Sequence, residues 1–147
     1  MKVAQGTIGR VFVLRLEDGD RLPDCVERFA SERGVRQGFC AFVGGVASGR
    51  IVVGPEDSVT MPPVPVLLGL VGAHEAAAVG TIFPDEQDQP KLHMHATFGR
   101  GESVRTGCIR PGIDIWTIGE FVLIELLGTD LVRKRDASTG FELLSPR

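Results

Sequence analysis

The spacing of apolar residues predicts a strand near the start of the chain and a sheet in its second part. Residues 10–16 form a run of β-branched, aromatic and aliphatic residues, which the turn sequence Asp18-Gly19-Asp20 closes. From Gly38 onward, short apolar runs broken by glycine follow one another, at residues 39–43, 51–53, 66–71, 75–83, 92–98 and 113–127. Such runs are typical of strands, so we expect nearly everything after residue 38 to be sheet.

Between the first strand and the later runs lies a single helical pattern. Leu22, Val26, Phe29 and Ala30 recur at helical spacing, which predicts one amphipathic helix of about three turns. Asp20 is placed to cap its start, and Gly34 is placed to end it. The pattern therefore predicts an α+β fold, with one main helix packed on a sheet.

The chain is expected to form one domain over residues 1–147, because 147 residues is a usual domain size and no linker or repeat interrupts it. The tail from Arg133 to Arg147 can add an edge strand around residues 141–144.

The long run from Ile113 to Leu127 is apolar on both alternating faces. A strand with one solvated face shows polar residues on that side, so this run needs a cover on each face. The helix can cover one face, and a second subunit is a natural cover for the other. The run therefore predicts self-association, with Trp116 or Phe121 near a subunit contact.

The chain has three histidines, His74, His93 and His95, and all lie within one stretch of predicted sheet. In residues 91–98 the even positions are apolar, so strand alternation puts His93 and His95 together on the opposite face. His74 begins the preceding strand pattern, which would pair with this one through a hairpin over residues 85–90, and it can supply a third imidazole.

Three neutral imidazoles with an open fourth position are the ligand set of a catalytic zinc centre. The alternative is that His93 and His95 are ordinary histidines satisfied by hydrogen bonds. The third histidine favours a divalent metal, with zinc as the first choice, although ligand type alone leaves the metal's identity open.

Few other residues are candidates to assist such a centre. In a regular strand Glu75 points away from His74, so it can act only if a bulge reorients it. Cys108 is either a fourth, soft ligand or a small buried residue. Arg110, beside Pro111-Gly112, could present its guanidinium to a small anionic ligand. The sequence does not place Glu120 or Glu125 in space.

Charge and cysteine content narrow the classes of function. The net charge is −3, so no overall field attracts a polyanion, and the one basic run, Arg133-Lys134-Arg135, is interpreted as a solvated strand end. Three scattered cysteines indicate reduced thiols, no apolar run has the length of a membrane span, and the cytoplasm is the expected location.

The motifs resemble the plant-and-prokaryote conserved (PPC or PCC) domain family in its bacterial and archaeal form. The likeness covers about residues 8–127, with residues 128–147 as a tail. The strand at residues 9–16, the helix and Gly34-Val35 resemble the opening of that domain, and its later sheet motifs are matched by Ala73-His74-Glu75, residues 79–84, residues 92–96 and residues 107–112. The resemblance implies a largely antiparallel sheet, a homotrimer, and a metal held by His74, His93 and His95. The fold also resembles that of alpha-acetolactate decarboxylase, a zinc enzyme with a three-histidine centre.

Two functions follow from these observations. The family resemblance implies a DNA-associated or regulatory trimeric module, although the AT-hook segments that accompany DNA binding in plant members are absent here. The histidine site instead favours a metal-dependent lyase or hydrolase acting on a small oxyanion-bearing substrate, with Arg110 holding the anion.

Overall fold

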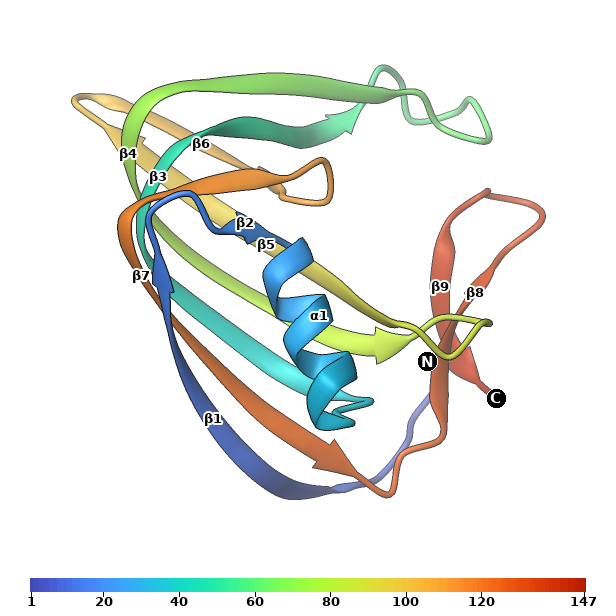
Figure 1. The fold of residues 1–147 in the computed structure, drawn as a ribbon. Helices are drawn as coiled ribbons and strands as arrows, with labels where there is room; N and C mark the ends of the chain where they lie inside the picture. The colour runs from blue at the N-terminus through green and yellow to red at the C-terminus, as the bar shows by residue number, and fades with distance from the viewer.

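The computed structural model describes residues 1–147, and a strongly curved sheet that wraps around a single helix dominates it (Figure 1). The strand order is β1-β7-β3-β4-β5-β6, with β2 paired to β7, and every pairing is antiparallel. The predicted α+β fold is therefore confirmed. The elements are β1 (Thr7–Glu17), β2 (Arg21–Leu22), α1 (Asp24–Arg33), β3 (Gly38–Pro55), β4 (Pro65–Pro84), β5 (Pro90–Arg100), β6 (Ser103–Cys108), β7 (Ile113–Leu127), β8 (Leu131–Arg135) and β9 (Glu142–Pro146).

The core lies on the concave side of the sheet, where α1 covers it (Figure 1). Alternate residues of β7, including Phe121 and Leu123, are fully buried there, and α1 contributes Val26 and Ala30. Because successive strand residues point to opposite faces, the same alternation leaves the residues between them on the convex side.

No helix has the length and apolar character that a membrane crossing needs.

The predicted helix is present, but it begins at a different residue. Asp20 was expected to cap it, yet the N-cap is Pro23, which makes no side-chain cap, and the Asp20 carboxylate accepts a hydrogen bond from Glu17 N–H at 2.9 Å. Proline has a fixed φ and lacks an N–H, so it suits the start of a helix, and Leu22 pairs in β2 instead. Gly34 ends the helix in the left-handed conformation, as predicted.

The C-terminal tail corrects two expectations. It was predicted to add an edge strand around residues 141–144, but β9 pairs with β8 in a separate two-stranded sheet. The basic run was interpreted as a solvated strand end, but Arg133 is only 6% exposed. The hairpin of β8 and β9 packs near β4, which removes this guanidinium from water.

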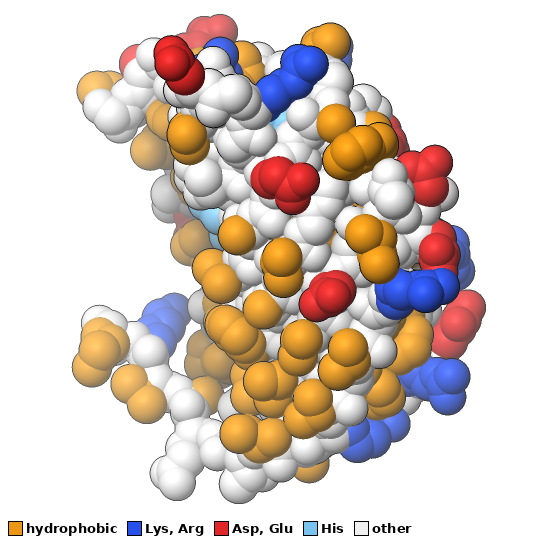
Figure 2. Space-filling model, turned by 90° about the vertical axis from the view of Figure 1, so that its left-hand side faces the viewer, with side chains coloured by type: hydrophobic (Ala, Val, Ile, Leu, Met, Phe, Trp, Pro, Cys, Tyr) orange, Lys and Arg blue, Asp and Glu red, His pale blue; other side chains and the backbone are white.

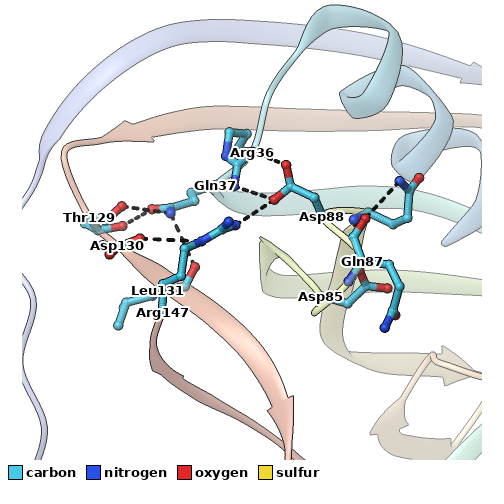
Figure 3. Close-up of polar contacts among 10 residues, drawn as sticks. Arg36, Gln37, Asp85, Gln87, Asp88, Thr129, Asp130, Leu131 and Arg147 are labelled. Atoms are coloured by element: carbon cyan, nitrogen blue, oxygen red, sulfur yellow. Dashed lines mark hydrogen bonds and ion pairs between the residues drawn. The ribbon is translucent and has the colours of Figure 1, made fainter.

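A polar network fixes this hairpin to the main sheet (Figure 3). Asp88, in the turn between β4 and β5, forms ion pairs with Arg36 and with the C-terminal Arg147. Gln37 donates to the backbone carbonyls of Thr129 and Leu131 in the segment that leads into β8. The hairpin is thus held at both of its ends beside the start of β5.

The convex face of the sheet is broadly apolar. Figure 2 shows orange side chains gathered over its lower part, with a few acidic side chains among them. The strand register places the side chains of this face in rows across neighbouring strands. One row, across β1, β7 and β3, is Val11, Ile124 and Phe39. Another row, which extends to β4, is Val13, Val122, Ala41 and Val79. Val13 is 75% exposed and Val79 60% exposed, so we call this surface the outer apolar face.

The two aromatic residues of β7 lie on different sides of the sheet. Trp116 is 46% exposed, whereas Phe121 is completely buried in the core. Phe121 therefore cannot lie at a subunit contact, because it faces the helix side, and Trp116 is the one of the two that a partner can reach.

A buried carboxylate on β7 gives a testable effect on stability. Glu125 is 6% exposed and accepts hydrogen bonds from Arg10, with Nη2 at 2.6 Å and Nε at 2.7 Å. The hydrogen bonds to Arg10 lower the pKa of Glu125. We expect Glu125→Gln to reduce the free energy of unfolding by about 1–2 kcal/mol at neutral pH, as measured by urea denaturation.

The difference in unfolding free energy between the parent and Glu125→Gln is also expected to depend on pH. A carboxylate whose folded pKa is depressed stabilises the protein above its unfolded pKa, about 4.3, and this stabilisation is lost as the pH falls through the folded pKa. The difference between the parent and Glu125→Gln should therefore shrink in acid. A difference that stays constant from neutral pH to about pH 3 would show that the charge of Glu125 does not contribute.

Candidate metal centre

His93 and His95 lie on β5 and point to the convex side of the sheet, as the sequence alternation predicts. The hairpin between β4 and β5 over residues 85–89 is also confirmed, and it pairs His93 with Thr81 and His95 with Val79. On its other side His95 pairs with Cys108 of β6. Directly paired residues of antiparallel strands point to the same face, so Cys108 joins the two histidines.

The three side chains are close enough to share one ion. His93 Nε2 and His95 Nε2 are 3.2 Å apart, and both lie within 4.8 Å of Cys108 Sγ. Two nitrogens bound to one tetrahedral zinc at about 2.0–2.1 Å are about 3.3 Å apart, so this separation fits a shared metal. It also fits a single N–H···N hydrogen bond between two neutral rings.

The environment keeps His93 neutral, the form in which an imidazole binds a metal. Burial, which is the largest cause, and the positive charges of Arg133, Arg110 and His95 together lower the pKa of His93 to about 4. The ring is therefore uncharged at neutral pH, and its nitrogen lone pair is available.

His74 lies apart from this group within the chain. It is on β4, five positions before Val79, the partner of His95, which is about 16 Å along the strand. Its ring packs edge-on against Phe98, a core residue, so it points to the face opposite His93 and His95. Its Nδ1 lies 2.6 Å from the carbonyl oxygen of Gly72.

The candidate carboxylates do not lie at the histidine pair. Glu75 is exposed on the convex side opposite Gly99, four positions from the residue opposite His95. Glu120 lies opposite Arg15 of β1 and Val43 of β3 in the strand register, in the middle of the outer apolar face. Glu125 forms an ion pair with Arg10. A catalytic role for Glu75 therefore stays a prediction, and its strand position is away from His93 and His95.

A pocket of about 330 Å³ opens beside His93, and Arg110, the candidate for holding an anion, lies on its wall. Its lining also includes residues that the sequence analysis did not select, and these are Pro23, Asp24, Glu27, Lys91, Leu92, Arg133 and Glu142. They come from α1, β5 and the C-terminal hairpin, which no periodic pattern places next to one another.

Comparison with known protein families identifies one match over most of the chain. The model of the Plants and Prokaryotes Conserved (PCC) domain matches residues 3–127. A curated relative, the bifunctional protein GlmU of Synechococcus sp. (strain JA-3-3Ab), is 30% identical over 137 residues, which is 90% of this chain. The chain spans about a fifth of the length of that relative, since the match covers 20% of it.

Solved structures share the whole fold. A metal-containing protein from Archaeoglobus fulgidus is 25% identical with a TM-score of 0.86, and 99% of each chain is covered. A plant- and prokaryote-conserved protein from Pyrococcus horikoshii is 21% identical with a TM-score of 0.83 and the same coverage. A protein from Bacteroides thetaiotaomicron, provisionally described as DNA-binding, is 18% identical with a TM-score of 0.76, covering 97% of this chain and 98% of its own.

Proposed function

The chain belongs to the Plants and Prokaryotes Conserved domain family, and on that basis we propose that it is a homotrimeric metal-binding module. The observation that carries the proposal is the 3.2 Å separation of the His93 and His95 Nε2 atoms beside Cys108. Imidazole and thiolate donors together suit zinc, which is the metal we propose. Bound there, zinc would act as a Lewis acid on any ligand that reached it.

The outer apolar face supports self-association. Its row Val13, Val122, Ala41, Val79 continues directly into His95 and Cys108. This is because Val79 of β4 lies opposite His95 of β5, and His95 lies opposite Cys108 of β6. A second subunit that covered this face would therefore also reach the edge of the histidine pair. Large exposed apolar surfaces usually mark such contacts.

The position of His74 favours a ring over a two-fold dimer. His74 is on the opposite face from His93, so a contact between two identical faces would leave it away from the centre. A head-to-tail contact joins different faces, and such contacts close into rings. We propose that His74 of each subunit supplies the third imidazole to the centre of the next. A Nδ1–H donated to the Gly72 carbonyl would leave His74 Nε2 free, as in many metal-bound histidines.

The purified protein tests this proposal directly. We expect about one zinc per chain by elemental analysis and a mass of three 15.8 kDa chains by light scattering. Metal-free protein that cannot be loaded with zinc would contradict the metal site. A concentration-independent monomer would contradict the ring.

Binding to duplex DNA is expected to be weak and without sequence preference. Tight phosphate binding needs clustered Lys and Arg, whereas the net charge is −3 and burial of Arg133 removes one member of the only basic run. Titration of AT-rich and mixed duplexes should give similar affinities that largely disappear by about 0.2 M salt. A sequence-selective dissociation constant in the nanomolar range would restore a DNA-binding function.

The pocket beside His93 favours a second candidate function, a metal-dependent lyase or hydrolase acting on a small oxyanion-bearing substrate. Arg110 would hold the anion while the metal polarises the reacting group. This function requires an open position on the metal, so it is excluded if Cys108 and three imidazoles fill all four positions.

A further inference from the structure

A buried arginine in the pocket beside His93 has unused hydrogen-bonding capacity. Arg133 is 6% exposed, and its Nε has no hydrogen-bond partner. Its Nη2 donates to Thr81 Oγ1 at 3.1 Å, and its guanidinium lies 5.9 Å from the centre of the Phe83 ring. Buried charged donors are rarely left without a partner. Nε itself is closed to solvent, so a ligand in the pocket reaches this guanidinium through its Nη groups.

Three acidic and three basic side chains line the pocket, and the two arginines among them lack an ion-pair partner. Glu27 accepts a hydrogen bond from Leu92 N–H at 2.9 Å and faces Lys91 Nζ at 3.7 Å, so these two charges offset each other. Asp24 is paired with Arg21 at 3.7 Å. Arg110 and Arg133 have no carboxylate within ion-pair distance, and Glu142, which is exposed, is the one acidic residue left.

The start of α1 borders the same pocket. Pro23 and Asp24 line it, and no side chain caps the helix. The Val26 and Glu27 N–H groups donate to the Pro23 carbonyl oxygen, so what the start of the helix offers an anion is mainly its dipole. The C-terminal hairpin, which carries Arg133, is held to the main sheet by the ion pairs of Asp88, and the guanidinium itself is positioned by Thr81 and Phe83.

We propose that this pocket binds a small oxyanion, the carboxylate or phosphate group of a small molecule, and that Arg133 is its main partner, with Arg110 at the rim. A planar guanidinium donates in parallel to two oxygens of such a group. The anion would lie beside His93, so the proposal deepens the proposed metal-binding function by assigning a ligand class to the space next to the metal. The binding itself needs only the protein groups, so the two proposals can fail separately.

Anion titration of the full-length protein tests the site, with inorganic phosphate and acetate as the two probes and chloride at equal ionic strength as reference. We expect a saturable rise in the melting temperature and a saturable shift of the Arg133 Nε–H signal in NMR spectra. Either anion supports the site, and the one that binds more tightly identifies the group. The absence of a saturable response to both would overturn the proposal.

Two variants on the same strand provide the matched comparison. Arg133→Met keeps an unbranched side chain in the buried position, and we expect it to weaken anion binding by about tenfold or more. Arg135→Met removes an exposed arginine and should change nothing. Equal binding by the parent and Arg133→Met would contradict the assignment. If Arg133→Met does not fold, the NMR signal of Arg133 in the parent decides the question.

Removal of the metal separates this site from the metal centre. With chelator-treated protein, we expect phosphate to shift the Arg133 signal as it does in untreated protein. Loss of the shift on chelation would mean that the metal binds the anion, and this would overturn the role of Arg133. A protein that contains no metal but still binds phosphate would contradict the metal site alone.

Discussion

Loss of either histidine of β5 is expected to empty the metal centre. In His93→Ala or His95→Ala, the content of zinc should fall from about one per chain to near zero. Each variant removes one imidazole of a pair whose Nε2 atoms are 3.2 Å apart. Loss of a partner outside the ligand shell already costs about 10–100-fold in metal affinity, so loss of a ligand should cost more. Elemental analysis after extensive dialysis measures the effect.

Two further variants define the rest of the ligand set. His74→Ala should also reduce metal content if a neighbouring subunit supplies His74, although it lies about 16 Å along β4 from the position opposite His95 in its own chain. Cys108→Ser should keep the metal if the fourth position is open, and lose it if the site is closed. Full metal content in both His93→Ala and His95→Ala would show that the metal site is assigned wrongly.

The double variant Val13→Glu with Val43→Glu is expected to convert the proposed trimer into a monomer. Val13 is 75% and Val43 58% exposed on the outer apolar face, so the folded chain can carry both carboxylates in water. In an assembled ring they would be buried without a partner, at several kcal/mol for each charge, and about 1.4 kcal/mol corresponds to a tenfold change in affinity. Light scattering should then give 15.8 kDa, the mass of one chain.

A control variant separates this effect from general changes in charge. Val59, 84% exposed in the loop between β3 and β4, lies outside the sheet, so Val59→Glu should leave the mass unchanged. Circular dichroism of the double variant should match that of the parent, because no core residue changes. A double variant that keeps the mass of the parent would mean that subunits associate through another surface.

Several features followed from the sequence because they depend on neighbouring residues. The apolar positions of residues 92–98 alternate, and this alone places His93 and His95 on one side of β5. Gly34 ends the helix because a left-handed residue is required there. The run 113–127 is a strand whose outward side is apolar, as its composition on both faces indicated.

The tertiary structure decided what depends on distant residues. The sequence predicts Arg133 to be part of a solvated basic run. Its burial follows only from the packing of the C-terminal hairpin near β4. The pocket joins α1, β5 and this hairpin, which no local pattern connects. Asp20 fits the pattern of a helix cap, but Pro23 starts the helix because Leu22 is held in β2.

The place of His74 depends on strand register, which the sequence leaves open. The pairing of Glu75 with Gly99 and Val79 with His95 puts His74 on the face opposite His93 and His95. A register shifted by one residue would have put all three on the same face, because strand side chains alternate with a period of two. The sequence thus determined that two histidines lie on one face of the sheet. Only the register of β4 against β5 decided that a third imidazole, if His74 supplies it, must come from another subunit.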